Sequence, residues 1–209
     1  MTGPEQPELR IGHRIEELRG ARGLTLSQLA GRAGLPEERL RAFEAGSEMP
    51  AVGELVRLAG ALDASVGHFF QRGHATRRVE VVRAADRFVV EPRSSAARTL
   101  NYRYQSLSYT LTDKLMSPFL VEIPPDEGAA APTSQHEGEE FMFVLSGQLE
   151  VRVGDEVHRL SPGDSIYFDS RVEHSLRAVE GRIVRLVVCV AEDRRPHPDD
   201  AMGRAYSGH

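Results

Sequence analysis

Three residues in the second half of the sequence have the types and spacing expected of a transition-metal site. His136 and Glu140 lie four residues apart, so both side chains can point to one side of a strand that begins at His136. His174 belongs to a different predicted strand. Two imidazoles and one carboxylate leave coordination positions open, which suits Fe(II) and is acceptable to Zn, Mn or Ni. Taken singly, His136 is better explained as an exposed loop histidine and Glu140 as a charge at the start of a strand, so the prediction depends on their combination.

The region after residue 85 predicts the short β-strands that would carry these side chains. Short alternating or apolar runs are separated there by Gly, Pro and Asp, which is typical of all-β domains. Gly154 and Asp155 predict a tight hairpin, and residues 124–134, rich in Pro and Ala, predict a loop. Nine runs favour a barrel or a sandwich: Arg87–Val90, Tyr102–Leu111, Phe119–Ile123, Glu140–Leu145, Leu149–Val153, Glu156–Leu160, Ser165–Phe168, His174–Arg177 and Ile183–Val190.

Residues 9–70 instead predict four or five short α-helices, because apolar positions recur there at spacings of three and four. The first helix is expected at about 10–21. Thr25 is a predicted N-cap for the second helix, which ends at Gly34, a residue that tolerates positive φ. Pro36 opens the third helix. A last long helix follows Pro50, so this part of the chain is predicted to be entirely α-helical.

The two segments SQHEGEEFMFVLSGQLEV and LSPGDSIYFDSRVEHSLRA resemble the two motifs of the cupin superfamily. The resemblance covers residues from about 86 to 191 and implies a double-stranded β-helix, the cupin jelly-roll barrel. It also implies that His136, Glu140 and His174 are metal ligands. The motif positions that match are His136, Glu140 and Gly147 in the first segment, and Pro162, Gly163, Asp164 and His174 in the second.

Two positions depart from the cupin pattern. Ser134 stands where the family often has its first histidine, and Ala178 stands where the pattern often ends in Asn. Loss of a ligand histidine leaves a second interpretation open, in which a metal-free pocket lined by the same residues binds an organic molecule through hydrogen bonds. Tyr102 and Tyr104 could each place a hydroxyl in the mouth of the barrel, although strand tyrosines more often serve packing. We therefore take Tyr102, Tyr104 and Ser134 as candidate pocket residues.

The segment GLTLSQLAGRAGLPEERLRAFEAG resembles the helix-turn-helix core of the XRE family of phage-repressor type. This resemblance implies a lambda-repressor-like bundle over residues 9–70 whose recognition helix enters the major groove of double-stranded DNA. It assigns base contacts to Glu37, Glu38, Arg39 and Arg41, and contacts to the DNA backbone to Thr25, Ser27 and Gln28. Residues 9–70 contain eight arginines and eight acidic residues, so they carry no excess of cations for phosphates. A vestigial or purely dimerising helical module is the alternative.

Composition sets the remaining expectations. A length of 209 residues has room for two domains, and 40% hydrophobic with 27% charged residues is typical of a globular protein. The lone Cys189 excludes a disulfide framework, and we expect neither a signal peptide nor a membrane span, so the protein is predicted to be cytoplasmic. The predicted plan is an α + β chain with a helix-turn-helix domain at 9–70, a linker at 71–85, a cupin barrel at 86–191 and a mobile tail at 192–209.

Two functions fit this plan. The first is a DNA-binding transcriptional regulator, a homodimer or higher homo-oligomer, whose cupin domain binds a small-molecule or divalent-metal effector. The second is a mononuclear non-haem Fe(II) oxidoreductase, because the same architecture occurs in an iron-dependent epoxidase that acts on hydroxypropylphosphonate, to which the chain is similar. That enzyme brings a lysine to its site where this chain has Gly23, and Lys114 is the only lysine in the sequence. The regulator is therefore favoured over the enzyme.

Overall fold

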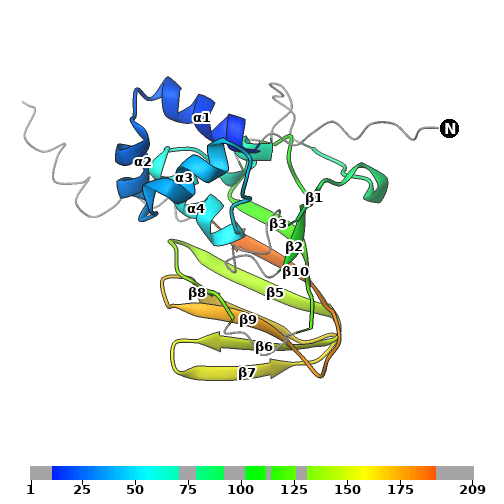
Figure 1. The fold of residues 1–209 in the computed structure, drawn as a ribbon. Coiled ribbons are helices and arrows are strands. Elements are labelled where there is room, and N and C mark those ends of the chain that lie inside the picture. Colours follow the sequence, from blue (N-terminus) through cyan, green and yellow to red (C-terminus); the bar gives the residue numbers. More distant parts are fainter. Residues whose placement is uncertain (1–10, 71–78, 92–101, 112–113, 126–130, 192–209) are drawn as a thin grey trace, which may run out of the picture.

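The computed structural model describes residues 11–70, 79–91, 102–111, 114–125 and 131–191. A helical bundle forms the first of these ranges and packs against one side of a β-sandwich (Figure 1). Most of the predicted linker and the whole predicted tail lie outside the described residues. The buried apolar side chains of the bundle and of the sandwich form one continuous hydrophobic cluster. This α + β arrangement confirms the predicted fold class.

The bundle contains α1 (Ile11–Ala21), α2 (Leu26–Ala33), α3 (Glu37–Glu44) and α4 (Val52–Ala61), followed by the 3₁₀-helix η1 (Val66–Phe70). Thr25 caps α2 as predicted, since its side chain accepts from Gln28 N at 3.1 Å while Gln28 returns the bond to Thr25 N at 2.9 Å. Gly34 ends α2 with φ of 62°, the left-handed conformation that glycine adopts without strain. Pro36 is the N-cap of α3 and not its first helical residue. The helices are therefore set by the capping signals in the sequence.

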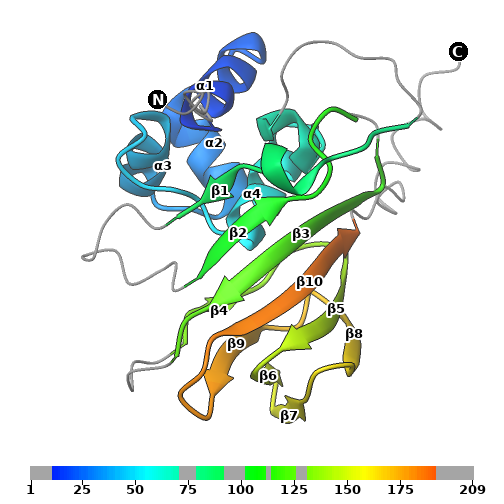
Figure 2. The same ribbon diagram turned by 90° about the vertical axis from the view of Figure 1, so that its right-hand side faces the viewer.

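The strands form two antiparallel sheets that face each other (Figure 2). One sheet has the order β1-β2-β3-β10-β5-β8 and the other has the order β4-β9-β6-β7. A short 3₁₀-helix, η2 (Ala84–Asp86), precedes the first strand. The strands are β1 (Val89–Val90), β2 (Arg103–Ser106), β3 (Met116–Ile123), β4 (Thr133–Ser134), β5 (Glu139–Ser146), β6 (Gln148–Val153), β7 (Glu156–Leu160), β8 (Ser165–Asp169), β9 (His174–Val179) and β10 (Val184–Ala191).

Two strand predictions were wrong. The predicted loop at residues 124–134 ends in strand β4, where Ser134 pairs with His174 of β9. The predicted strand Tyr102–Leu111 ends at Ser106, because the chain beyond it binds the carboxylate of Glu80. That carboxylate accepts three backbone N–H groups of residues 109–111 and a hydroxyl, at 2.7–3.4 Å. Backbone groups that are satisfied by a carboxylate have no need of a sheet neighbour.

Candidate metal centre and nucleic-acid interface

His136, Glu140 and His174 meet between the two sheets. Their potential ligand atoms all lie within 4.8 Å of one another, and each of the three residues is only 4% exposed. Glu140 comes from β5 of the six-stranded sheet and His174 from β9 of the four-stranded sheet, so closure of the sandwich brings them together. His136 lies before β5, and not on it as the parity argument assumed. The sequence nevertheless identified the three residues that the structure gathers.

Backbone carbonyl groups fix the orientation of both imidazole rings. His136 Nδ1 lies 3.0 Å from Glu137 O, and His174 Nδ1 lies 3.0 Å from Val172 O. A carbonyl oxygen can only accept, so each Nδ1 carries the hydrogen and each Nε2 is directed at Glu140. This is the arrangement in which a histidine binds a metal through Nε2 while its other nitrogen is held by a second group.

The loop before β5 holds His136 in place through its backbone. His136 N donates to Ser170 O at 3.1 Å, and Ser170 N donates in turn to Gly138 O at 3.0 Å. Gly138 has φ of 98°, which a residue with a Cβ rarely adopts. This glycine turns the chain between His136 and β5, so that a residue outside the strand still reaches the space between the sheets.

Electrostatics favour an ionised carboxylate at this site. Glu140 Oε1 lies 2.7 Å from His136 Nε2 and 3.6 Å from His174 Nε2. Burial alone would raise the pKa of Glu140, but the hydrogen bonds of the two histidines outweigh it and lower the pKa to about 2. Burial likewise opposes the charge of His174, and its hydrogen bond to Glu140 raises the pKa overall. An anionic oxygen that faces two imidazole nitrogens is stabilised by shared protons or by a divalent cation.

The donor set fits a divalent transition metal. Ligands that share such an ion lie roughly 3–4 Å apart, so these side chains need only small adjustments to hold one. Two histidines and one carboxylate with open positions form the set that suits Fe(II), and Zn, Mn or Ni are acceptable. When bound, the ion would supply a Lewis-acidic centre with free positions for water or a small ligand.

A cavity of about 50 Å³ is lined by two of the three residues, Glu140 and His174. Of the predicted pocket residues, Tyr102 and Ser134 line it, together with Glu140 and His174. Tyr104 does not line it, and its hydroxyl instead donates to Pro50 O at 2.8 Å. Burial raises the pKa of Tyr102, so its hydroxyl remains protonated. The full lining is Val52, Gly53, Tyr102, Val121, Pro132, Ser134, Glu140, His174, Ser175, Leu176 and Val188.

Helix α4 of the bundle forms part of the wall of this cavity, which the sequence did not reveal. Val52 and Gly53, at the start of α4, belong to the lining. Val52 N donates to the Tyr102 hydroxyl at 3.3 Å. A Cβ built on Gly53 would overlap Ser134 Oγ and lie 3.1 Å from His136 Cδ2. The sequence shows a glycine and a glutamate, Gly53 and Glu54, within an apolar helix, but neither residue type indicates which part of the protein the helix contacts.

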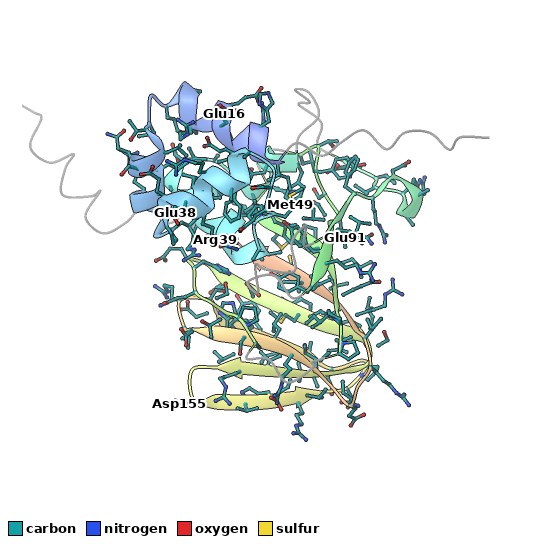
Figure 3. The ribbon with its side chains drawn as sticks, in the orientation of Figure 1. Glu16, Glu38, Arg39, Met49, Glu91 and Asp155 are labelled. Atoms are coloured by element: carbon teal, nitrogen blue, oxygen red, sulfur yellow. The ribbon has the colours of Figure 1, made fainter. Side chains whose placement is uncertain are left out.

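The predicted DNA-contacting residues divide into two groups. Thr25, Ser27, Gln28, Glu38 and Arg41 are exposed on α2, its N-cap and α3, and Glu37 is partly exposed. Arg39 is different, because its side chain is only 15% exposed and forms ion pairs with Glu48 and Glu54. In Figure 3 Arg39 lies on the side of the bundle nearer the sheets, whereas Glu16 of α1 lies on the opposite side.

Arg39 is therefore engaged within the protein and does not present its guanidinium for a base contact. Its Nη1 lies 2.9 Å from Glu48 Oε2, and its guanidinium stacks over the Phe43 ring at 4.9 Å from the centroid. The remaining exposed cations of α2 and α3 are Arg32 and Arg41. Arg32 was missed by the sequence argument, although its place in the last turn of α2 puts it on the same exposed surface.

Known protein families match both halves of the chain. Residues 10–68 match the family described as Helix-turn-helix domain, and residues 119–190 match the family described as Cupin domain. The chain is a helix-turn-helix protein with a C-terminal cupin domain. None of the helices in the described part of the chain is long and apolar enough to cross a membrane.

Several known proteins are similar to this chain. The HTH-type transcriptional regulator PuuR of Escherichia coli (strain K12) is 22% identical over 86% of this chain and 93% of its own. An uncharacterised HTH-type transcriptional regulator of Rickettsia prowazekii (strain Madrid E) is 38% identical over 29% of this chain and 47% of its own. The crystal structure of an HTH_3 family transcriptional regulator from Vibrio cholerae superposes with a TM-score of 0.63 at 24% identity, over 89% of this chain and 97% of that chain, which shows the shared fold.

Proposed function

We propose that this helix-turn-helix transcriptional regulator binds double-stranded DNA through α2 and α3 and holds a divalent metal with His136, Glu140 and His174 as part of its effector site. The observation that carries this proposal is that Val52 and Gly53 of α4, in the helical bundle, line the same cavity as the candidate ligands Glu140 and His174. An effector there would touch the DNA-binding domain directly. A small molecule can enter the cavity alone or share the metal's open positions, with Tyr102 and Ser134 as hydrogen-bonding partners.

The DNA surface proposed is the exposed part of α2 and α3. Thr25, Ser27 and Gln28 would contact phosphates, and Glu37, Glu38 and Arg41 would reach base edges, where Glu can accept from cytosine N4. Arg39 is left out of this surface, because its carboxylate partners already occupy it. Because its proposed target is DNA, we expect the regulator to act in the cytoplasm and to have no membrane partner.

We infer a homodimer or higher homo-oligomer, because a single half-site contact gives too little affinity. The outer face of the six-stranded sheet offers an apolar row for this pairing. Tyr167, Phe141, Cys189 and Pro118 are neighbours across four strands, and Tyr167 is 62% exposed. A face of this kind suits a second copy of the chain. Light scattering on the purified chain and on Phe141→Glu tests this assignment: a monomeric variant supports it, and an unchanged oligomer contradicts it.

The main experiment measures metal and DNA together. The protein is purified without chelator, its bound metal is quantified, and its affinity for its own promoter fragment is measured over a salt series with and without EDTA. Sequence-selective, salt-dependent binding that changes with EDTA supports the proposal. Loss of the EDTA effect in Glu140→Gln would assign the effect to this site. Bound iron with no DNA binding above background would contradict the regulator and favour an Fe(II) oxidoreductase.

A further inference from the structure

The first turn of α4, residues 51–54, lies between the candidate metal centre and the recognition helix. On one side Gly53 packs so closely on the metal centre that a Cβ would overlap Ser134 Oγ and approach His136 Cδ2 at 3.1 Å. The N–H of Val52 is bonded to Tyr102 in the same cavity. Any outward movement of the segment that carries Ser134 and His136 therefore meets the backbone of α4.

On its other side the same turn is bonded to α3. The Glu54 carboxylate accepts from Nε and Nη2 of Arg39, the second at 3.0 Å, and also from Ala51 N at 2.8 Å. The Glu54 side chain is only 10% exposed, so this two-pronged ion pair is shielded from solvent. Glu54 thus joins the first turn of α4 to the first turn of α3.

Gly53 and Glu54 are consecutive residues of one helical turn, so a shift at the cavity must move the carboxylate that holds Arg39. Closely packed helices move as rigid elements between discrete arrangements and do not deform continuously. Figure 3 shows Arg39 on the side of the bundle nearer the sheets, consistent with this connection.

We propose that the first turn of α4 transmits the occupancy of the His136–Glu140–His174 site to α3, with the Glu54–Arg39 ion pair as the link. This inference rests on the proposed function, because it requires that metal occupancy alters DNA affinity. The pair is a positioning device: Arg39 sets the placement of α3 and need not touch DNA itself.

The test measures one ratio, the promoter Kd of the chelator-stripped protein divided by the Kd of the same full-length protein loaded with Zn²⁺. A direct effect of a substitution on DNA binding cancels in this ratio, whereas a loss of coupling does not. The test variant is Glu54→Gln. The matched control is Glu44→Gln, because Glu44 forms an equivalent two-pronged pair with Arg19, at 2.7 and 2.8 Å, on the same helix α3 but away from the cavity.

In the wild type the ratio is expected to differ from 1 by roughly 5- to 150-fold in either direction. Glu54→Gln should bind Zn²⁺ like the wild type but bring the ratio close to 1, and Glu44→Gln should keep the wild-type ratio. If Glu54→Gln folds poorly, Arg39→Lys is used in its place. Lysine keeps the positive charge but lacks the two guanidinium N–H groups that bind the Glu54 carboxylate.

Three results would contradict the inference, and each has a different meaning. A wild-type ratio above or below 1 that persists in Glu54→Gln and Arg39→Lys refutes this route while leaving the proposed function intact. A wild-type ratio of 1 with Zn²⁺ demonstrably bound refutes metal-responsive regulation itself. A change of the ratio in Glu44→Gln as large as that in Glu54→Gln shows a general loosening of the bundle and overturns the specific link.

Discussion

Two glycines of α4 provide a direct test of the packing between the bundle and the cupin domain. Alanine in place of Gly60 meets nothing within 4 Å, so the variant should gain the helical preference of alanine over glycine, about 0.5–1 kcal/mol. Alanine in place of Gly53 would force its Cβ into Ser134 Oγ. Overpacking of this kind costs about 1–3 kcal/mol, so the free energy of unfolding of Gly53→Ala should be about 1–3 kcal/mol lower than that of Gly60→Ala, which has the same helical gain.

A second substitution should relieve the predicted clash between residue 53 and Ser134. Ser134→Ala removes the overlapping oxygen, which leaves the new Cβ 3.1 Å from His136 Cδ2 and 3.4 Å from Ser134 Cβ. Gly53→Ala combined with Ser134→Ala should therefore be more stable than the two single changes predict, by about 1 kcal/mol. Urea denaturation followed by far-UV circular dichroism measures the wild type and the four variants, since the chain has no tryptophan for fluorescence. A Gly53→Ala variant as stable as Gly60→Ala would refute the contact between α4 and the cavity.

Three further predictions follow from the same contacts. Zn²⁺ at 100 times its Kd should stabilise the wild type by about 2.7 kcal/mol and raise Tm by roughly 5–10 °C. If the same rise in Tm is measured for both His136→Ala and His174→Ala, these histidines are not zinc ligands. Arg32 and Arg41 are the exposed cations of α2 and α3, four in a dimer, so the log–log slope of promoter binding against salt concentration should be no steeper than about −4, and a slope near −8 would locate most phosphate contacts elsewhere. Burial would raise the pKa of Glu80, but hydrogen bonds from residues 108–110 outweigh it and lower the pKa, so the carboxylate's contribution to stability is present at neutral pH and declines as pH falls below 4.5. Glu80→Gln should therefore cost about 1 kcal/mol at pH 7 and less at pH 3 in urea titrations, and an equal cost at both would refute the assignment.

The bundle could be predicted from the sequence because its signals are local. Thr25, Gly34 and Pro36 mark helix boundaries through their own backbone preferences, and each lies at or beside the boundary that the structure shows. The short strand β4 could not be found in this way. A strand of two residues is too short to show an alternating pattern of apolar and polar side chains, and its pairing with β9 depends on a contact between segments distant in sequence.

The three candidate ligands could be identified from the sequence, but the reason given for one of them was incomplete. Strand parity explains why Glu140 faces inward, since it lies on β5. It does not explain His136, whose position depends on the turn at Gly138 and on a bond to Ser170 O. The roles of Gly53, Glu54 and Arg39 were beyond sequence reasoning, because each depends on how two domains pack, and an exposed arginine and an ion-paired arginine on a helix look alike in the sequence.

The cavity also bears on the choice between a regulator and a phosphonate-oxidising enzyme. A phosphonate is dianionic and is best recognised by lysine or arginine in addition to a metal. Within the described part of the chain the cavity lining contains neither, and Lys114 bonds to Ser108 O. The cavity is lined instead by the first turn of α4, whose Glu54 pairs with Arg39 of α3, and a regulator that senses occupancy of the site requires such a connection.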